Sequence, residues 1–256
     1  MALQYIPLLQ QQRELLQLPP GRDRFEEYLR TISSDGQTID FPPLTMFNPM
    51  AKDHVAALLD EYIALGADEI GSEILNQFRH IDSRSLQINV ALVVVDDLKG
   101  GWTNRFDYEF KLRFKSFSQP SDNTLPTWMK NYWLSAVLWS SEPASERKIR
   151  EAILTAVHRF EYVCRHGSAR NLRAMLAQEG YVLHTAGCVE PTLDPDDLNY
   201  SRAVLFSYLD ATDLRTCIEC LFGDEAGATL GCTPRGLSPW AGLALALHDF
   251  KLKNEY

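Results

Sequence analysis

One continuous apolar run constrains the fold of this chain more than any other stretch. Residues 90–95 read VALVVV, and such β-branched, wholly apolar runs are typical of a central strand that is covered on both faces. The run stops at the acid pair Asp96 and Asp97, which is followed by the turn sequence LKGG. We therefore expect a buried strand that ends in two firmly positioned carboxylates.

The segment after this turn alternates between apolar and charged residues. The apolar members are Phe106, Tyr108, Phe110, Leu112 and Phe114. Alternation with a period of two is typical of a strand with one buried and one solvated face. Two strands joined by a short glycine-containing loop predict an antiparallel hairpin, and residues 131–141 (NYWLSAVLWSS) predict a third strand.

Helical patterns flank this region on both sides. Asn48 is the expected N-cap of one helix, with Pro49 at its first position and Gly66 as its stop. Asp194 before Pro195 is a second such start. The order predicts a single α+β domain over 1–256: helical at 1–80, an antiparallel sheet of at least three strands at about 86–140, and helical at 143–256. Neither strand–helix–strand alternation nor a Gly-rich fingerprint is evident, which argues against a nucleotide-binding fold.

Composition excludes several classes of protein. The chain has 25 Lys and Arg against 34 Asp and Glu, a formal net charge of −9, so it lacks the positive excess that nucleic-acid phosphates require. Its apolar runs fall short of the roughly 20 residues of a membrane helix, and its N-terminus lacks the basic start of a signal peptide. Five cysteines argue against a disulfide scaffold. We expect a soluble cytoplasmic protein that binds neither nucleic acid nor membrane.

The acid pair is the first candidate site. Partial burial would raise the pKa of Asp96 or Asp97 towards general acid–base duty, and Arg105 is expected nearby on the facing strand. Asp96, Asp97 and Arg105 are therefore the candidate catalytic residues. The competing interpretation is that Asp, Asp and Gly only form the turn that ends the strand, and the residues favour this plainer interpretation.

A second set of residues could bind an anionic ligand or an acidic partner. Lys111 and Arg113 lie on the charged side of the alternating segment, Trp102 lies near its start, and Arg235 follows Pro234 in a tight loop. The alternatives are a charged edge strand, a core tryptophan and a plain connector. We expect the remaining tryptophans of this region either to fill the core or to form an interface.

Metal and cofactor motifs give little support for a prosthetic group. Two thiols and two imidazoles, those of Cys164, His166, His184 and Cys188, fall within 25 residues, which is formally enough for zinc. Their spacing matches no standard zinc motif, so we expect neither a metal site nor a cofactor.

Two hypotheses about function remain. The favoured one is a non-catalytic protein that binds an unknown protein partner or associates with itself through the aromatic sheet region. The alternative is a small-molecule-binding protein or enzyme that uses Asp96 and Asp97 with Arg105 at the end of the sheet.

Overall fold

The computed structural model describes residues 2–78, 87–98, 103–114 and 133–254. The chain divides into two compact units. Unit 1 comprises Met1–Arg105 and Thr124–Ala156, and unit 2 comprises Phe106–Asn123 and Val157–Tyr256. The expected single domain over residues 1–256 stays a prediction.

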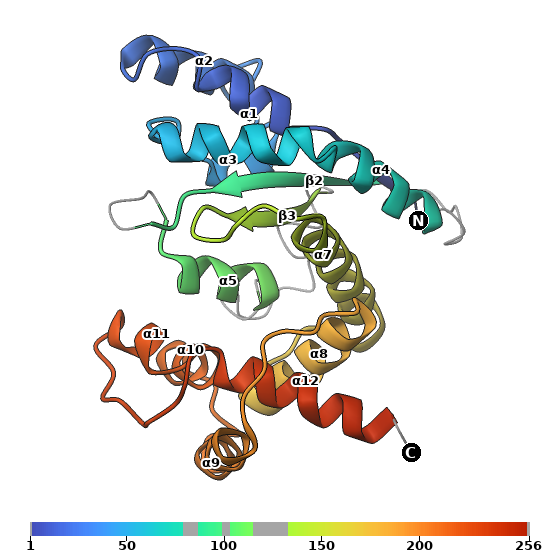
Figure 1. Cartoon of the computed structure of the whole chain (residues 1–256), viewed down its shortest axis with the longest axis vertical. Coiled ribbons are helices and arrows are strands. Elements are labelled where there is room, and N and C mark those ends of the chain that lie inside the picture. Colours follow the sequence, from blue (N-terminus) through green and yellow to red (C-terminus); the bar gives the residue numbers. More distant parts are fainter. Residues whose placement is uncertain (1, 79–86, 99–102, 115–132, 255–256) are drawn as a thin grey trace. The chain divides into compact units, whose positions relative to one another are not determined.

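Unit 1 contains the sheet and the N-terminal helices. In chain order its elements are β1 (Ala2–Tyr5), α1 (Leu9–Leu15), α2 (Arg22–Ile32), the 3-10 helix η1 (Pro42–Met46), α3 (Asp53–Ala64), α4 (Ala67–Gln77), β2 (Gln87–Val95) and β3 (Trp133–Trp139). Helix α7 (Glu146–His166) contributes its residues up to Ala156 to this unit. Helices α1, α3 and α4 lie along one side of the sheet (Figure 1).

The three strands are all parallel, in the order β1-β2-β3. Tyr5 of β1 pairs with Val90, and Val95 at the end of β2 pairs with Trp139 at the end of β3. The predicted antiparallel sheet is therefore wrong, although the strands at Val90–Val95 and within 131–141 are present. Strands β2 and β3 end side by side, so the residues that follow them meet at one carboxyl edge.

The error in strand direction traces to residues 105–114, which form helix α5 (Arg105–Phe114) and no strand. In the helix Lys111 pairs with Asp107 at 2.6 Å and Arg113 pairs with Glu109 at 3.1 Å, both at i,i+4 spacing. Because a helix intervenes, the chain crosses over before it enters β3, and a crossover yields parallel strands where a hairpin yields antiparallel ones.

Two expectations for the N-terminal region also need correction. Residues 2–5 form a strand within the stretch expected to be helical, and α3 begins at Asp53, with Lys52 as N-cap. The Asn48 side chain instead accepts a hydrogen bond from the backbone N–H of Met50 at 2.9 Å and so forms a turn before the helix. Gly66, with a φ of 69°, does end α3 as predicted.

Strand β1 is too short to cover the whole of β2, and a side chain completes the pairing. Ile6 N–H donates to the Val90 carbonyl at 2.9 Å, beyond which β1 has ended. The buried Gln12 amide then donates to the Val94 carbonyl and accepts from the Val94 N–H, each at 3.0 Å. Helix α1 thus supplies the hydrogen bonds that a longer β1 would have made.

Every regular element of unit 2 within the described residues is a helix. Its elements are the rest of α5 and α7, α8 (Leu172–Thr185), α9 (Pro195–Phe206), α10 (Leu214–Phe222), α11 (Asp224–Ala228) and α12 (Ala241–Asn254). Residues 241–247 of α12 are all buried, which fits its apolar sequence. A Cβ at Gly180 of α8 would lie 2.6 Å from the Ala246 carbonyl oxygen, so this glycine permits the close approach of α8 and α12.

Candidate functional site

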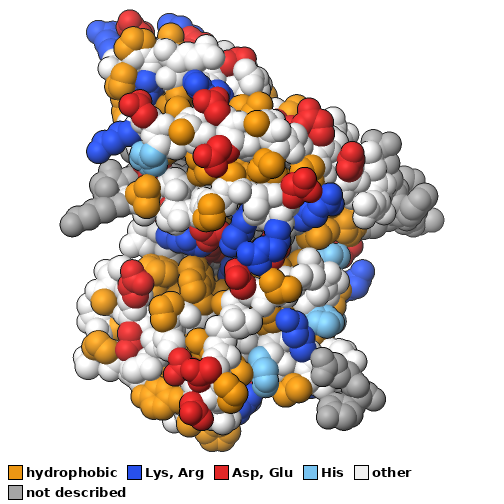
Figure 2. Space-filling model, viewed as in Figure 1, with side chains coloured by type: hydrophobic (Ala, Val, Ile, Leu, Met, Phe, Trp, Pro, Cys, Tyr) orange, Lys and Arg blue, Asp and Glu red, His pale blue; other side chains and the backbone are white. Residues whose placement is uncertain are grey.

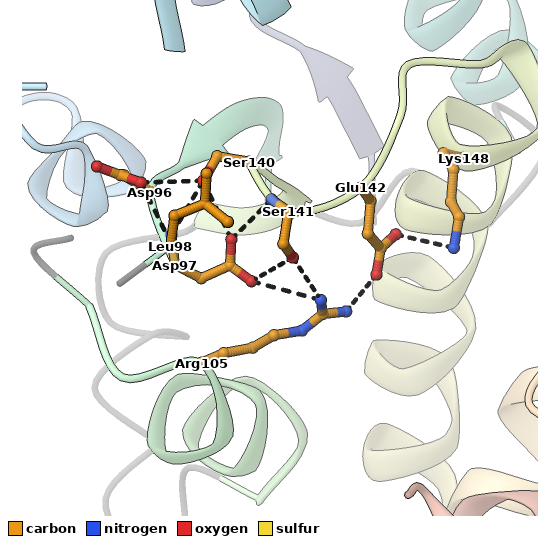
Figure 3. Close-up of polar contacts among 8 residues, drawn as sticks. All are labelled: Asp96, Asp97, Leu98, Arg105, Ser140, Ser141, Glu142 and Lys148. Carbon is orange, nitrogen blue, oxygen red and sulfur yellow. Dashed lines mark hydrogen bonds and ion pairs between the residues drawn. The ribbon is translucent and has the colours of Figure 1, made fainter. Parts of the chain in front are cut away.

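Four polar residues gather at the carboxyl edge of the sheet in unit 1 (Figure 3). Asp96 and Asp97 directly follow β2, and Ser140 and Ser141 directly follow β3. Because β2 and β3 are parallel and end in register, the two pairs face each other. Ser140 Oγ lies 3.0 Å from Asp96 Oδ1 and 3.1 Å from Asp97 Oδ1, so the two carboxylates share the single proton of this hydroxyl.

The Asp97 carboxylate is fully occupied by neighbours. Its Oδ1 accepts hydrogen bonds from Ser140 Oγ at 3.1 Å and from the Ser141 N–H at 2.9 Å. Its Oδ2 accepts from Ser141 Oγ at 2.7 Å and from Arg105 Nη1 at 3.4 Å. The side chain is only 3% exposed. Asp97 therefore ties the loop after β2 to the loop after β3.

Arg105 extends this network towards helix α7. Its guanidinium also donates to Ser141 Oγ at 3.1 Å and to Glu142 Oε1, and it lies over the Trp139 ring at 5.2 Å. Lys148 Nζ holds the other oxygen of Glu142 at 2.8 Å. Burial alone would raise the pKa of Glu142, but Arg105 and Lys148 more than offset it and hold that pKa below its usual range.

Asp96 differs from Asp97 because only one of its oxygens is in use. Oδ1 lies 3.0 Å from His54 Nε2, 3.0 Å from Ser140 Oγ and 3.4 Å from the Leu98 nitrogen. Oδ2 accepts no hydrogen bond from any residue that the structure describes. The Asp96 side chain is 6% exposed and that of His54 is 36% exposed, so a buried carboxylate holds an imidazole that reaches solvent.

The contact with Asp96 sets which nitrogen of His54 is available. A carboxylate accepts hydrogen bonds, so Nε2 carries the proton in the neutral ring and Nδ1 presents its lone pair. Nδ1 makes no hydrogen bond with the described residues. An imidazole oriented by a carboxylate through one nitrogen can take a proton at the other, which is the arrangement of a general base.

Sequence reasoning missed His54, Ser140 and Ser141. His54 is the second residue of α3, a helix that lies between β1 and β2 in the chain. A helix that connects parallel strands runs antiparallel to them, so its first turn lies at their carboxyl edge. The parallel topology was the missing signal, because an antiparallel hairpin gives no reason to place His54 beside Asp96.

The structure brings Asp96, Asp97 and Arg105 together, whereas the predicted ligand-binding cations each hold a carboxylate elsewhere, in unit 2. Lys111 pairs with Asp107, and Arg235 pairs with Glu219 while its guanidinium lies 4.4 Å from the Tyr208 ring centre. Arg113 pairs with Glu109 and with Glu179. Trp102 lies outside the described residues. The binding and catalytic roles assigned from sequence stay predictions.

Arg113 belongs to a buried network of charges in unit 2. Arg159 donates two hydrogen bonds to Glu179, of 2.8 and 2.9 Å, and Gln178 Nε2 donates a third at 3.1 Å. The Glu179 side chain is 0% exposed, and both of its oxygens are in use. Burial would raise the pKa of Glu179, but Arg159 and Arg113 outweigh it, so the pKa is lowered and the group stays charged.

The cysteine and histidine candidates for a metal also lie in unit 2. Cys164 is exposed and Cys188 is buried, while His166 and His184 lie against the rings of Tyr162 and Phe250. Within residues 2–78, 87–98, 103–114 and 133–254, no group of three or more His, Cys, Asp or Glu side chains could hold a metal ion.

No helix in the described part of the chain combines the length and apolar character needed to cross a membrane.

Comparisons of the chain with protein-family models, with curated proteins and with solved structures return no match.

Proposed function

We propose that the protein is an enzyme that acts on a small polar molecule at the carboxyl edge of its parallel sheet, with His54 as the acid–base group. The observation that carries the proposal is the pair formed by the buried Asp96 and the half-exposed His54, whose atoms Oδ1 and Nε2 lie 3.0 Å apart. The unused Nδ1 of His54 and Oδ2 of Asp96 are the atoms offered to a substrate.

The place of this pair in the fold supports the proposal. In open sheets of parallel strands, ligands bind outside the carboxyl ends of the strands, where loops are held by a rigid scaffold. That rule is an analogy between folds, so the weight of the argument rests on the side chains themselves. Asp97 and Arg105 are assigned as positioning residues, because they hydrogen-bond to each other and to Ser141 in the loop after β3.

A purely structural role explains less of the geometry. Asp96 Oδ1 also has the Leu98 N–H at 3.4 Å and shares the single proton of the Ser140 hydroxyl with Asp97, so His54 is one of three contacts at that oxygen. An imidazole that is 36% exposed gains little from an ion pair in water-like surroundings. The contact does fix the tautomer and direction of the ring, which a general base requires.

Loss of turnover in matched variants tests the proposal. The wild-type protein is incubated with a pool of small polar cell metabolites, and substrate consumption is followed by mass spectrometry. His54→Ala should lower the rate by about 10²–10⁴-fold, the usual contribution of a general acid–base group. Asp96→Asn should lower the rate by less, because an amide oxygen can still accept from His54 Nε2 but no longer carries the charge. His248→Ala is the control, because His248 also pairs with a carboxylate, at 3.2 Å from Asp249, and is 39% exposed. Turnover that survives in His54→Ala contradicts the proposal.

Self-association, or binding of a protein partner, is kept as the second proposal. One observation favours it: the Phe206 side chain at the end of α9 is 76% exposed, which is unusual for a large apolar residue. Native mass spectrometry of wild type and Phe206→Asp distinguishes an oligomer that uses this residue from a monomer.

We also propose that the protein resides in the cytoplasm. Cys164 is exposed and forms no disulfide, which suits a reducing compartment.

A further inference from the structure

Five aromatic rings form a continuous row across three helices of unit 2. We call this the aromatic row; in order of contact it comprises His166, Tyr162, Tyr181, Phe250 and His184. Successive ring centres lie 4.5, 5.3, 5.9 and 5.2 Å apart. His166 and His184 are exposed, and the three middle rings are half-buried. The row is therefore a surface feature and not part of the core.

Close helix packing builds the row. Gly180 allows α8 to approach the backbone of α12 at Ala246, and the next residue along α8, Tyr181, meets Phe250 four residues further along α12. Tyr162 and His166 lie one turn apart on α7 with their rings in contact, and Tyr162 also contacts Tyr181. Rings held at these separations present a rigid apolar face at low conformational cost.

Cations flank the row at the helix ends. The last turns of α7, α8 and α12 carry Arg165 with His166, then His184, then Lys251 with Lys253. His and Lys or Arg side chains gather over α8 and α12 in Figure 2. Arg165, Lys251 and Lys253 make no ion pair with any residue in the described part of the chain.

The neighbouring carboxylates neutralise these cations only in part. The charge of Asp249 is taken up by Arg202 at 2.6 Å, while Glu161 lies 3.0 Å from the His158 ring and keeps its negative charge if that ring is neutral. The helix dipoles account for only part of the charge, because each C-terminus is equivalent to about −0.5 elementary charge, or roughly −1.5 for three helices. Among the described residues, the three formal positive charges of Arg165, Lys251 and Lys253 exceed the sum of these dipoles and the charge of Glu161 by about half a charge, on a protein whose net charge is −9.

We propose that the aromatic row binds an acidic peptide segment of a partner protein, with an apolar or aromatic residue of the peptide on the rings and its carboxylates on Arg165, Lys251 and Lys253. Charge complementarity selects this occupant: the row is apolar and its border is cationic. A short peptide with a few carboxylates is favoured over a nucleic acid, because long-range repulsion from a net charge of −9 grows with the charge of the approaching chain.

Fluorescence anisotropy of the full chain tests this proposal. The probe is a short fluorescein-labelled peptide in which two tryptophans stand among glutamates, and the comparison probe has lysines in place of the glutamates. We expect the wild type to bind the glutamate peptide at least tenfold more tightly than the lysine peptide. The charge reversal Lys251→Glu/Lys253→Glu should weaken that binding by tenfold or more.

Two further variants separate the row from general charge effects. Tyr181→Ala, with its folding checked by circular dichroism, should also weaken binding by about tenfold because it interrupts the row. Lys52→Glu/Arg150→Glu makes the same change in net charge at exposed positions of unit 1, and it should leave binding unchanged.

Four results would overturn the proposal. They are failure of the wild type to bind the glutamate peptide, equal binding of the lysine peptide, equal weakening by the unit 1 control, and tighter binding of single-stranded oligothymidine that is lost in Lys251→Glu/Lys253→Glu. The last of these would assign the row to nucleic acid instead.

Discussion

The two charged clusters of this protein differ in how many carboxylate oxygens are already in use. In unit 2 both oxygens of Glu179 accept hydrogen bonds from Arg159, Arg113 forms a further ion pair with Glu179, and the side chain is 0% exposed. At the sheet edge of unit 1, Asp97 is similarly occupied, but Asp96 leaves Oδ2 without a hydrogen bond from the described residues and holds a histidine that reaches solvent. Saturated charges hold a fold together, whereas an unsaturated buried charge beside a titratable group is the better sign of chemistry.

The largest expected effect is in the saturated cluster. Glu179→Gln leaves Arg159 and Arg113 without their shared counter-charge and sets an amide N–H₂ against a guanidinium. We expect a loss of about 3–5 kcal/mol in the free energy of unfolding, measured with urea. The double variant Arg159→Met/Glu179→Met keeps Arg113 paired with Glu109 at 3.1 Å. Its loss of unfolding free energy should be smaller than the sum of the losses in Arg159→Met and Glu179→Met alone. Additive losses would show that the network is not coupled.

A smaller effect distinguishes the two neighbouring aspartates. Asp97→Asn places a donor where Ser141 and Arg105 donate, and should cost roughly 1.5–3 kcal/mol of unfolding free energy. Asp96→Asn can keep its occupied Oδ1 as a carbonyl and put the amide nitrogen at the unused position, so it should cost less than about 1 kcal/mol. Urea unfolding of both variants measures the difference. Equal losses would remove the distinction on which the proposed enzyme rests.

The smallest expected effect is the pH dependence of Glu142. Its pKa in the folded chain is lowered, so its contribution is fully present above the unfolded value of about 4.3 and is lost as the pH falls towards the folded pKa. Glu142→Gln should therefore cost about 1 kcal/mol at pH 7, and the gap to wild type should close on the acid side. Thermal unfolding between neutral and acid pH measures this. Glu146→Gln is the control, because Glu146 is exposed, and a gap that widens in acid would contradict the assignment.

The local parts of the fold were predictable from the sequence. The apolar run at Val90–Val95 and the residues Trp133–Trp139 within the predicted segment 131–141 form strands, because each carries its own pattern of burial. The cap at Asp194 is confirmed, since its side chain accepts from the Asp197 N–H at 2.8 Å. These features depend on residues close together in the sequence.

Strand direction was not predictable from the alternation at 105–114. Phe106, Phe110 and Phe114 are spaced by four, which fits one face of a helix as well as one face of a strand. The oppositely charged pairs at i,i+4 favour the helix, and they were the signal that could have corrected the prediction. Strand β1 has only four residues, too few for any periodicity.

The candidate site was predictable only in part for the same reason. Asp96 and Asp97 directly follow a recognisable strand, so their place at its end could be derived. His54 lies 42 residues away in the sequence from Asp96, and only the course of α3 between parallel strands brings it there. The contact between His54 and Asp96 could therefore be predicted only after the parallel order of the strands was known.

The Gln12 amide also bears on whether another chain could pair with the edge of β2. The edge of a strand is a template on which another chain can pair, and β2 has no strand partner on the β1 side after Val90. Because the side chain of Gln12 occupies both the N–H and the carbonyl of Val94, an incoming strand finds no free ladder there. The Gln12 side chain in α1 therefore takes the place at Val94 that the backbone of a further strand would otherwise occupy.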